Sequence, residues 1–231
     1  MFISYADAIK TKREPLEKLL GKEQGKPLGL AKTEPYCDLK LSEIGSRIFP
    51  PEYPDIDKIT FTGSSETGKR LMQSCLKTLK SVMLELGGND PAIICDNIDI
   101  DAIMPKIATL IFLNSGQICM LIKRIYVYEN IYDKFRDALV AYAKTIRVGD
   151  GFEPDVLIGP LRNSMQYEKL KELYSSIDTC NWKQALEGRI VSESQGYFVT
   201  PSIIDNPPDD SKIVVEEPFG PIVPLLKWSG A

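Results

Sequence analysis

The sequence predicts an α/β fold built on a largely parallel sheet. Short runs rich in β-branched and aromatic residues alternate with amphipathic helical patterns along most of the chain. The 231 residues suit one large domain or two small ones. An apolar fraction of 43% and a charged fraction of 26% are ordinary for a globular protein. We find no internal repeat or low-complexity tract.

The first part of the chain predicts two helices and two strands around an irregular junction. A helix is expected over residues 5–22, where Pro15 starts a new turn and the apolar side carries Ile9, Leu16, Leu19 and Leu20. Residues 34–56 contain four prolines and are expected to be irregular. Strands are expected over 58–62 and 81–86. Between them, a helix over 66–79 is capped by Ser64 or Ser65 and has an apolar row made of Leu71, Cys75 and Leu79.

The second part of the chain continues the alternation. Strands are expected over 91–95, 124–128, 197–204 and 222–226. A helix over 101–113 is expected to hold Pro105 in its first turn. Two further helices show clear amphipathic patterns. The first, 131–146, has the stripe Ile131, Phe135, Leu139, Tyr142 and Ile146, and the second, 164–177, has Leu170, Leu173 and Ile177.

Charge and cysteine content narrow the class of protein. The net charge of −4 provides no basic surface for nucleic acid or for anionic lipid. The longest apolar run, around 110–113, is too short to cross a bilayer, and residues 1–7 do not resemble a secretory signal. Five cysteines, without a Cys-x-x-Cys pair, predict reduced thiols and a cytoplasmic location.

Cys119 is the candidate nucleophile, and Glu85 is its candidate base. A thiol reacts as the thiolate and therefore needs a base or a positive field nearby. The chain contains no histidine, which excludes Cys-His and Ser-His-Asp machinery and imidazole-ligated zinc. We therefore expect a carboxylate to serve as the base, and we expect no metal. The alternative for Cys119 is a buried structural cysteine, and for Glu85 a solvated side chain at a strand end.

Four short segments, in order, carry a family resemblance. They are Phe61-Thr62-Gly63-Ser64, Glu85-Leu86-Gly87-Gly88, Gly116-Gln117-Ile118-Cys119 and Glu217-Pro218-Phe219-Gly220-Pro221. Together they resemble the aldehyde dehydrogenase superfamily, from about Asp57 to Trp228. The resemblance implies a Rossmann-like dinucleotide-binding portion over 1–86, with an irregular junction at about 30–56, and a parallel-sheet catalytic domain over 87–231. Family members are about twice as long, so we expect a shortened relative that lacks much of the cofactor sheet and the end of the catalytic domain.

The resemblance also implies an activity and a set of roles. The activity is the NAD- or NADP-dependent oxidation of an aldehyde to a carboxylic acid through a thiohemiacetal and a thioester on Cys119, with Glu85 as general base. Gly63, Ser64 and Leu86 would contact the cofactor, with Ser64 at its pyrophosphate. Glu217 would bind the nicotinamide ribose, and Phe219 would pack near the ring. For Ser64 a plain helix cap, and for Glu217 and Phe219 a rigid turn, remain the alternatives.

The chain departs from the family pattern at several points. The family's upstream oxyanion asparagine and its ribose-binding lysine have no counterpart here. Met120, Leu121 and Ile122 stand where the family has smaller or polar residues, so a more apolar thiol pocket is expected. These departures leave two alternatives open, namely a redox-inactive relative that uses the cleft for other chemistry, and a non-catalytic partner protein. A homo-oligomer, or association with another protein through exposed apolar edges, is expected with the shortened fold.

A rival interpretation comes from Gly63–Arg70. This stretch nearly matches the phosphate-binding loop of P-loop NTPases, although Arg70 replaces the hydroxyl residue that would hold magnesium. The stretch follows a predicted strand and precedes a predicted helix, as a P-loop does, but an NTPase would leave the three other segments unexplained.

Overall fold

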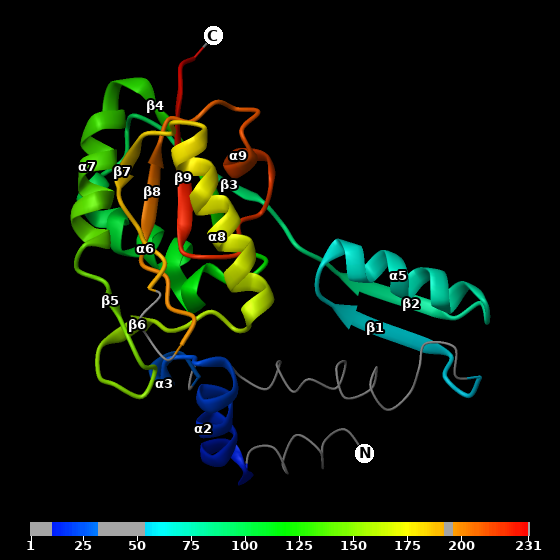
Figure 1. The fold of residues 1–231 in the computed structure, drawn as a ribbon. Coiled ribbons are helices and arrows are strands. Elements are labelled where there is room, and N and C mark those ends of the chain that lie inside the picture. The colour runs from blue at the N-terminus through cyan, green and yellow to red at the C-terminus, as the bar shows by residue number, and fades with distance from the viewer. Residues whose placement is uncertain (1–10, 32–53, 192–195, 231) are drawn as a thin grey trace. The chain divides into compact units, whose positions relative to one another are not determined.

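The computed structural model describes residues 11–31, 54–191 and 196–230, and these form two compact units (Figure 1). The larger unit contains the described residues up to 31 together with 89–230, and the smaller one contains 54–88. Residues 11–31 therefore group with the second part of the chain, whereas the sequence predicted a division into 1–86 and 87–231. The assignment of these parts as cofactor-binding and catalytic domains stays a prediction.

The smaller unit is a strand–helix–strand unit. Strand β1 (Lys58–Thr62) pairs in parallel with β2 (Ser81–Glu85), from Lys58 opposite Ser81 to Thr62 opposite Glu85, and α5 (Ser65–Leu76) connects them. Ser64 caps α5, because its side chain accepts a hydrogen bond from the backbone N–H of Thr67 at 3.2 Å. The predicted strands and the cap are thus confirmed.

The predicted helix over 66–79 is too long at its C-terminal end. Helix α5 ends at Leu76, and Leu79 adopts a left-handed φ of 51° with 86% of its surface exposed. Leu71 and Cys75 are buried as expected. The apolar spacing includes Leu79 although it lies in the turn after the helix. Periodicity alone cannot distinguish a leucine in the last turn of a helix from one in the turn that follows.

The larger unit is built on a five-stranded sheet. The strands lie in the order β3 (Asp90–Ile94), β4 (Ile122–Tyr128), β9 (Ile222–Trp228), β8 (Ser202–Asp205) and β7 (Gln184–Leu186). All neighbouring pairs are parallel except β7 with β8, which is antiparallel. The predicted α/β fold with a largely parallel sheet is confirmed.

Helices cover both faces of this sheet (Figure 1). Helices α6 (Ile100–Phe112) and α7 (Tyr132–Ala143) pack with β4 and β9 in one apolar core, in which Phe112, Ile125, Phe135 and Leu225 are buried. Helices α8 (Ser164–Thr179) and α9 (Lys212–Val215) form a second core with Ile204, Ile222 and Leu226. Alternate residues of β8 and β9 point into opposite cores, as the strand period of two requires.

Several boundaries differ from the predicted ones. Pro105 is the sixth residue of α6, so it lies in the second turn rather than the first. The predicted helix 131–146 is the shorter α7, preceded by a 3-10 turn (Glu129–Ile131) and followed by β5 (Arg147–Val148). The predicted strand 197–204 narrows to β8. Helix α8 confirms the prediction for 164–177, with its three apolar residues buried.

Small elements complete the larger unit. They are α2 (Arg13–Gln24), α3 (Leu28–Ala31), β6 (Val156–Ile158), which pairs in parallel with β5, and the 3-10 helix η1 (Leu113–Gly116). Pro15 lies in the first turn of α2, as expected. Ile9 and most of the predicted junction 34–56 lie outside the described residues.

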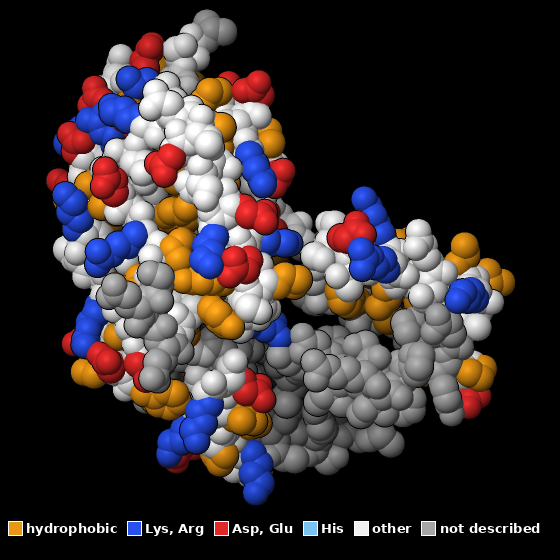
Figure 2. Space-filling view, in the orientation of Figure 1, with side chains coloured by type: hydrophobic (Ala, Val, Ile, Leu, Met, Phe, Trp, Pro, Cys, Tyr) orange, Lys and Arg blue, Asp and Glu red, His pale blue; other side chains and the backbone are white. Residues whose placement is uncertain are grey.

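The face of the larger unit seen in Figure 2 mixes Lys and Arg with Asp and Glu side chains, without a broad area of one sign among the described residues. None of the helices in the described residues of either unit has the length and apolar character needed to cross a membrane.

Candidate active site

The Cys119 loop, residues 113–121, leads from α6 into the amino end of β4. It begins with three consecutive left-handed residues, Asn114 (φ 51°), Ser115 (φ 59°) and Gly116 (φ 73°). Non-glycine residues rarely adopt such angles, and the strain is maintained only where surrounding contacts stabilise it. The loop therefore needs several fixed contacts.

Hydrogen bonds supply these contacts. The Ser115 hydroxyl, which is buried, donates to the carbonyl oxygen of Gly159 at 2.8 Å. The side-chain Nε2 of Gln117 donates across the turn to the Asn114 carbonyl at 3.2 Å, and the Gln117 Oε1 accepts from the backbone N–H of Arg162 at 3.0 Å. The loop is thus attached both to the segment after β6 and to the segment before α8.

Cys119 follows this turn as a half-buried free thiol. None of the described residues accepts a hydrogen bond from its backbone N–H. Met120 is 75% exposed, whereas Leu121 is 2% exposed and packs in the interior. Of the residues expected to make the thiol surroundings apolar, Met120 thus points into solvent.

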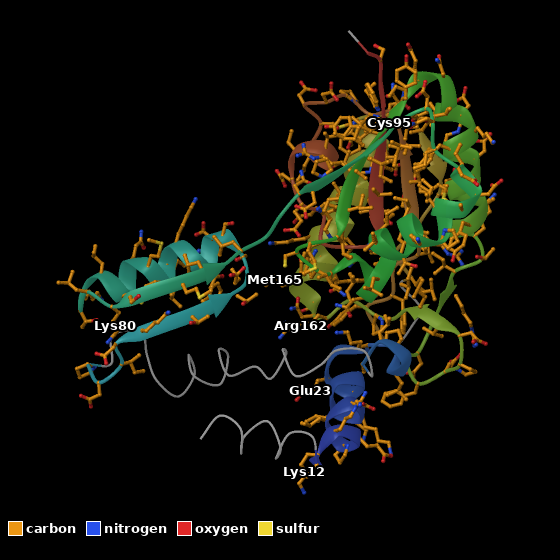
Figure 3. The ribbon with its side chains drawn as sticks, turned by 180° about the vertical axis from the view of Figure 1, so that it is seen from behind. Lys12, Glu23, Lys80, Cys95, Arg162 and Met165 are labelled. Atoms are coloured by element: carbon orange, nitrogen blue, oxygen red, sulfur yellow. The ribbon has the colours of Figure 1, made fainter. Side chains whose placement is uncertain are left out.

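The parallel topology brings three chain segments to the same edge of the sheet. Strands β3, β4 and β9 are neighbours and run in one direction, so their amino ends coincide. The Cys119 loop precedes β4, Asn89 precedes β3, and Glu217–Pro221 precedes β9. The backbones of two of these segments touch, because a Cβ added to Gly116 would overlap the carbonyl oxygen of Gly220. Figure 3 shows Cys95, which follows β3, at the other end of this unit from Arg162.

The segment Glu217–Pro221 is also held in a strained form. Phe219 has a φ of 45°, which is a rare conformation for a bulky residue. The side-chain amide of Gln166, in the first turn of α8, donates to the carbonyl oxygens of Pro218 and Phe219 at 3.1 Å each. Glu217 and Phe219 are half-buried. The structure therefore brings Cys119, Glu217 and Phe219 to one edge of the sheet.

Lys123 lies among these residues and was not predicted from the sequence. It is 2% exposed, its Nζ donates a hydrogen bond to the Gly116 carbonyl, and it lies 5.3 Å from the centre of the Phe219 ring. Burial lowers the pKa of Lys123 to about 8, and the charges of Glu217, Cys119 and Asp90 partly oppose this effect.

The smaller unit positions the other candidate residues. Glu85 ends β2 with an exposed side chain, and its carbonyl oxygen accepts a hydrogen bond from the backbone N–H of Gly63 at 3.0 Å. Leu86 packs on α5, because a Cβ added at Gly68 would lie 2.9 Å from its Cδ2. Gly63, Ser64, Glu85 and Leu86 are therefore neighbours at the carboxyl edge of the two strands, where α5 begins.

The P-loop interpretation fails within this unit. Helix α5 begins at Ser65, so Gly68 and Lys69 lie inside the helix rather than in a loop before it. Gly68 is buried against Leu86, and its backbone N–H bonds to the Ser64 carbonyl, so it cannot bind a phosphate.

Across the described residues, no group of three or more His, Cys, Asp or Glu side chains could hold a metal ion.

The resemblance expected from the sequence is supported by comparison with known proteins. The model of the aldehyde dehydrogenase family matches residues 40–230. A probable aldehyde dehydrogenase of a Pseudomonas species is 41% identical over 76% of this chain and 36% of its own length. A succinate-semialdehyde dehydrogenase of Escherichia coli, whose name specifies NADP(+), is 35% identical over 76% of this chain and 36% of its own length.

Solved structures agree with these relatives. The NAD+ complex of an aldehyde dehydrogenase from Bacillus cereus superposes with a TM-score of 0.74 at 34% identity, covering 78% of this chain and 37% of that one. The first curated relatives are matched over 36–46% of their own length, so this chain spans less than half of each. With the family model matching most of its length, the chain belongs to the aldehyde dehydrogenase family.

Proposed function

We propose that this chain takes part in the NAD- or NADP-dependent oxidation of an aldehyde to a carboxylic acid, with Cys119 as the nucleophile. The observation that carries the proposal is the Cys119 loop itself. It presents a free, half-buried thiol on a strained turn, beside a free backbone N–H, where three parallel strands begin. A rigid turn of this kind holds a nucleophile at a fixed place relative to its substrate.

Cys119 would add its sulfur to the carbonyl carbon, forming a C–S bond while its proton passes to a base. The developing negative charge on the carbonyl oxygen would be stabilised by the Cys119 backbone N–H. After loss of the hydride the acyl group would remain on the sulfur as a thioester, and water would hydrolyse it to the acid and restore the thiol. Glu85 is the proposed base for the thiol and for the water, supported by its exposed carboxylate and by the family resemblance.

The described residues fit part of a dinucleotide. Gly63 and Ser64 join a strand to the N-terminus of a 12-residue helix, where backbone N–H groups and the helix dipole favour a phosphate. Leu86 packs beside this turn. Glu217 and Phe219 are proposed to hold the ribose and the nicotinamide, because a carboxylate can accept hydrogen bonds from a diol and a fixed phenyl ring can pack on a flat heterocycle. When bound, the oxidised nicotinamide would supply the acceptor for the hydride.

NAD and NADP are both represented among the names of similar proteins, and so are different aldehydes. We therefore propose the reaction class without choosing between the two cofactors or naming one substrate. A reducing cytoplasmic location stays a prediction, which the exposed thiols of Cys95 and Cys180 support. Association with a second copy or with another protein stays a prediction.

The test is formation of reduced nicotinamide by the purified chain, with NAD and with NADP, over a panel of aliphatic, aromatic and semialdehyde substrates. Cys119→Ser should abolish formation, whereas Cys95→Ser, which removes an exposed thiol beyond the carboxyl end of β3, should leave it unchanged. Full turnover by Cys119→Ser would exclude this mechanism. Absence of turnover in the parent with either cofactor would favour the redox-inactive alternative.

A further inference from the structure

Lys123 is a buried cation that contacts two loops of the candidate active site. Its side chain is 2% exposed, although it lies on β4 four residues after Cys119. The Nζ atom donates to the Gly116 carbonyl in the Cys119 loop and lies 5.3 Å from the centre of the Phe219 ring in the loop before β9. One side chain thus contacts both loops in the place where Gly116 and Gly220 touch.

We propose that Lys123 is a positioning residue that holds the Cys119 loop against the Glu217–Phe219 segment and places a buried positive charge near the Cys119 sulfur. The inference deepens the proposed function, since it rests on Cys119 being the nucleophile. Gly116 is the last residue of the strained turn, so a hydrogen bond to its carbonyl restrains the backbone that leads to Cys119.

Three ionisable groups, each from a different segment of the chain, act on Lys123. Asp90 lies at the start of β3, Glu217 precedes β9, and Cys119 belongs to the loop before β4, and each raises the pKa of Lys123. Burial has the larger effect and lowers that pKa to about 8. The ammonium is therefore mostly protonated at neutral pH and loses its proton as the pH passes through about 8.

A purely structural role would not require this residue type. Burying an ammonium costs free energy, and a methionine of similar length fills a buried space without that cost. Cation–aromatic contact with Phe219 and the hydrogen bond to Gly116 offset part of the cost. Lys123 contacts the loop that carries Cys119, and the charge of Cys119 raises the pKa of Lys123, so the two groups interact. This interaction supports a role in thiol reactivity, because a nearby cation favours a thiolate.

The experiment measures alkylation of individual cysteines by iodoacetamide in the full chain, followed by mass spectrometry of the peptides. The variants are Lys123→Met, which removes charge and donor, Lys123→Gln, which keeps an N–H donor without the charge, and the control Lys134→Met on the exposed side of α7. Cys95 and Cys180, both exposed, are internal reference thiols.

At pH 7 we expect Cys119 in Lys123→Met to react about three- to tenfold more slowly than in the parent, the range that a single nearby charge produces. The difference should shrink as the pH rises through about 8, since the parental lysine then loses its charge. Lys123→Gln should also react slowly at pH 7. Cys95 and Cys180 should react equally in all proteins, and Lys134→Met should match the parent.

Equal Cys119 alkylation in the parent and Lys123→Met at pH 7 would overturn the proposal, and so would a faster reaction in the variant, which indicates a merely loosened loop. If Lys123→Met fails to fold, the test is the pH dependence of Cys119 alkylation in the parent protein. Its Cys119 alkylation profile should require two ionisations, one near pH 8, and a single ionisation would contradict the proposal. No aldehyde or nicotinamide enters the assay, so its outcome is separate from failure of the proposed function.

Discussion

Gly116 and Gly220 lie in backbone contact, and this contact joins the loop that carries Cys119 to the loop that carries Glu217 and Phe219. Any side chain at Gly116 would overlap the Gly220 carbonyl, and the φ of 73° at Gly116 is itself unfavourable for other residues. The relationship explains why a glycine is needed three residues before the thiol. Because the two backbones touch, the position of each loop also constrains the position of the other.

Gly116→Ala should therefore destabilise the protein and disturb the thiol. We expect a loss of about 1–3 kcal/mol in the free energy of unfolding, from strain at a left-handed residue together with the overlap. Denaturant unfolding measures the loss, and iodoacetamide measures the changed reactivity of Cys119. Gly230→Ala is the matched control, since a Cβ there would meet no atom within 4 Å. Equal stability of the two variants would refute the contact as described.

Lys123 predicts a particular dependence of stability on pH. Its pKa falls from 10.5 in the unfolded chain to about 8 in the folded one, so the unfolded chain binds more protons between these values. Stability should consequently rise with pH through this window, by at most about 3 kcal/mol. Burial raises the pKa of Tyr132 and of Tyr174, so above about pH 10 the folded chain binds more protons at these tyrosines than the unfolded chain does. The two tyrosines therefore lower stability as the pH rises above about 10, which is opposite to the effect of Lys123.

The difference between the parent and Lys123→Met isolates this contribution, because the tyrosine terms are common to both proteins. Urea unfolding at a series of pH values should show the parent gaining stability relative to the variant as the pH rises from about 8 toward 10.5. A difference that stays constant over the window would show that Lys123 is not titrating there.

Tyr132 should contribute to stability through Asp205, which is 7% exposed. The Tyr132 hydroxyl hydrogen-bonds to Asp205 Oδ1 at 2.5 Å and to the Leu225 carbonyl at 3.1 Å. Burial alone would raise the pKa of Asp205, but hydrogen bonds from Lys183 and Tyr132 and the charges of Lys183 and Arg136 lower it. Tyr132→Phe leaves both oxygen atoms without this donor and should cost about 1–3 kcal/mol of unfolding free energy.

The cost should be largest near neutral pH. It should decrease as the pH falls through the pKa of Asp205, because a protonated carboxyl no longer benefits from the donor. Thermal and denaturant unfolding measure it. Tyr142→Phe, on the same helix, is the control, since none of the described residues hydrogen-bonds to its hydroxyl. Similar effects of the two substitutions would count against the network.

Ser64 combines a structural and a proposed functional role, and the two can be separated. Ser64→Ala should cost about 1 kcal/mol by removing the cap of α5. Asp99→Ala removes the cap of α6 and should cost a similar amount. If Ser64 also contacts a cofactor phosphate, only Ser64→Ala should weaken NAD or NADP binding, measured by calorimetry. Equal binding by both variants would leave Ser64 as a helix cap alone.

The sequence predicted the fold class and most elements because their signals are local. The β1 strand, the Ser64 cap and the apolar stripe of α8 each follow from neighbouring residues. Ends were less predictable, as Leu79 and Pro105 show, since a periodic pattern does not reveal where a helix begins or ends. The short antiparallel strand β7 was missed because its pairing depends on β8, many residues away.

The site was predictable only in part. Cys119, Glu217 and Phe219 were recognised from short segments, and the structure brings them to one edge of the sheet. Lys123 was missed because a lysine in a strand normally points into solvent. Its burial depends on contacts with both Gly116 and Phe219, and Phe219 is distant from the other two residues in the sequence. A useful signal would have been its position between the buried residues Leu121 and Ile125, in a strand of alternating exposure.

The proposal that Cys119 is the nucleophile is tested by locating a covalent acyl group on the protein. The chain would be incubated with an aldehyde and an oxidised nicotinamide, quenched with acid, digested, and its cysteine peptides weighed by mass spectrometry. We expect an acyl mass on the peptide that contains Cys119, absent without the nicotinamide and absent in Cys119→Ser. An acyl group on Cys95 or Cys180 instead, or turnover without any adduct on Cys119 under rapid quenching, would contradict it.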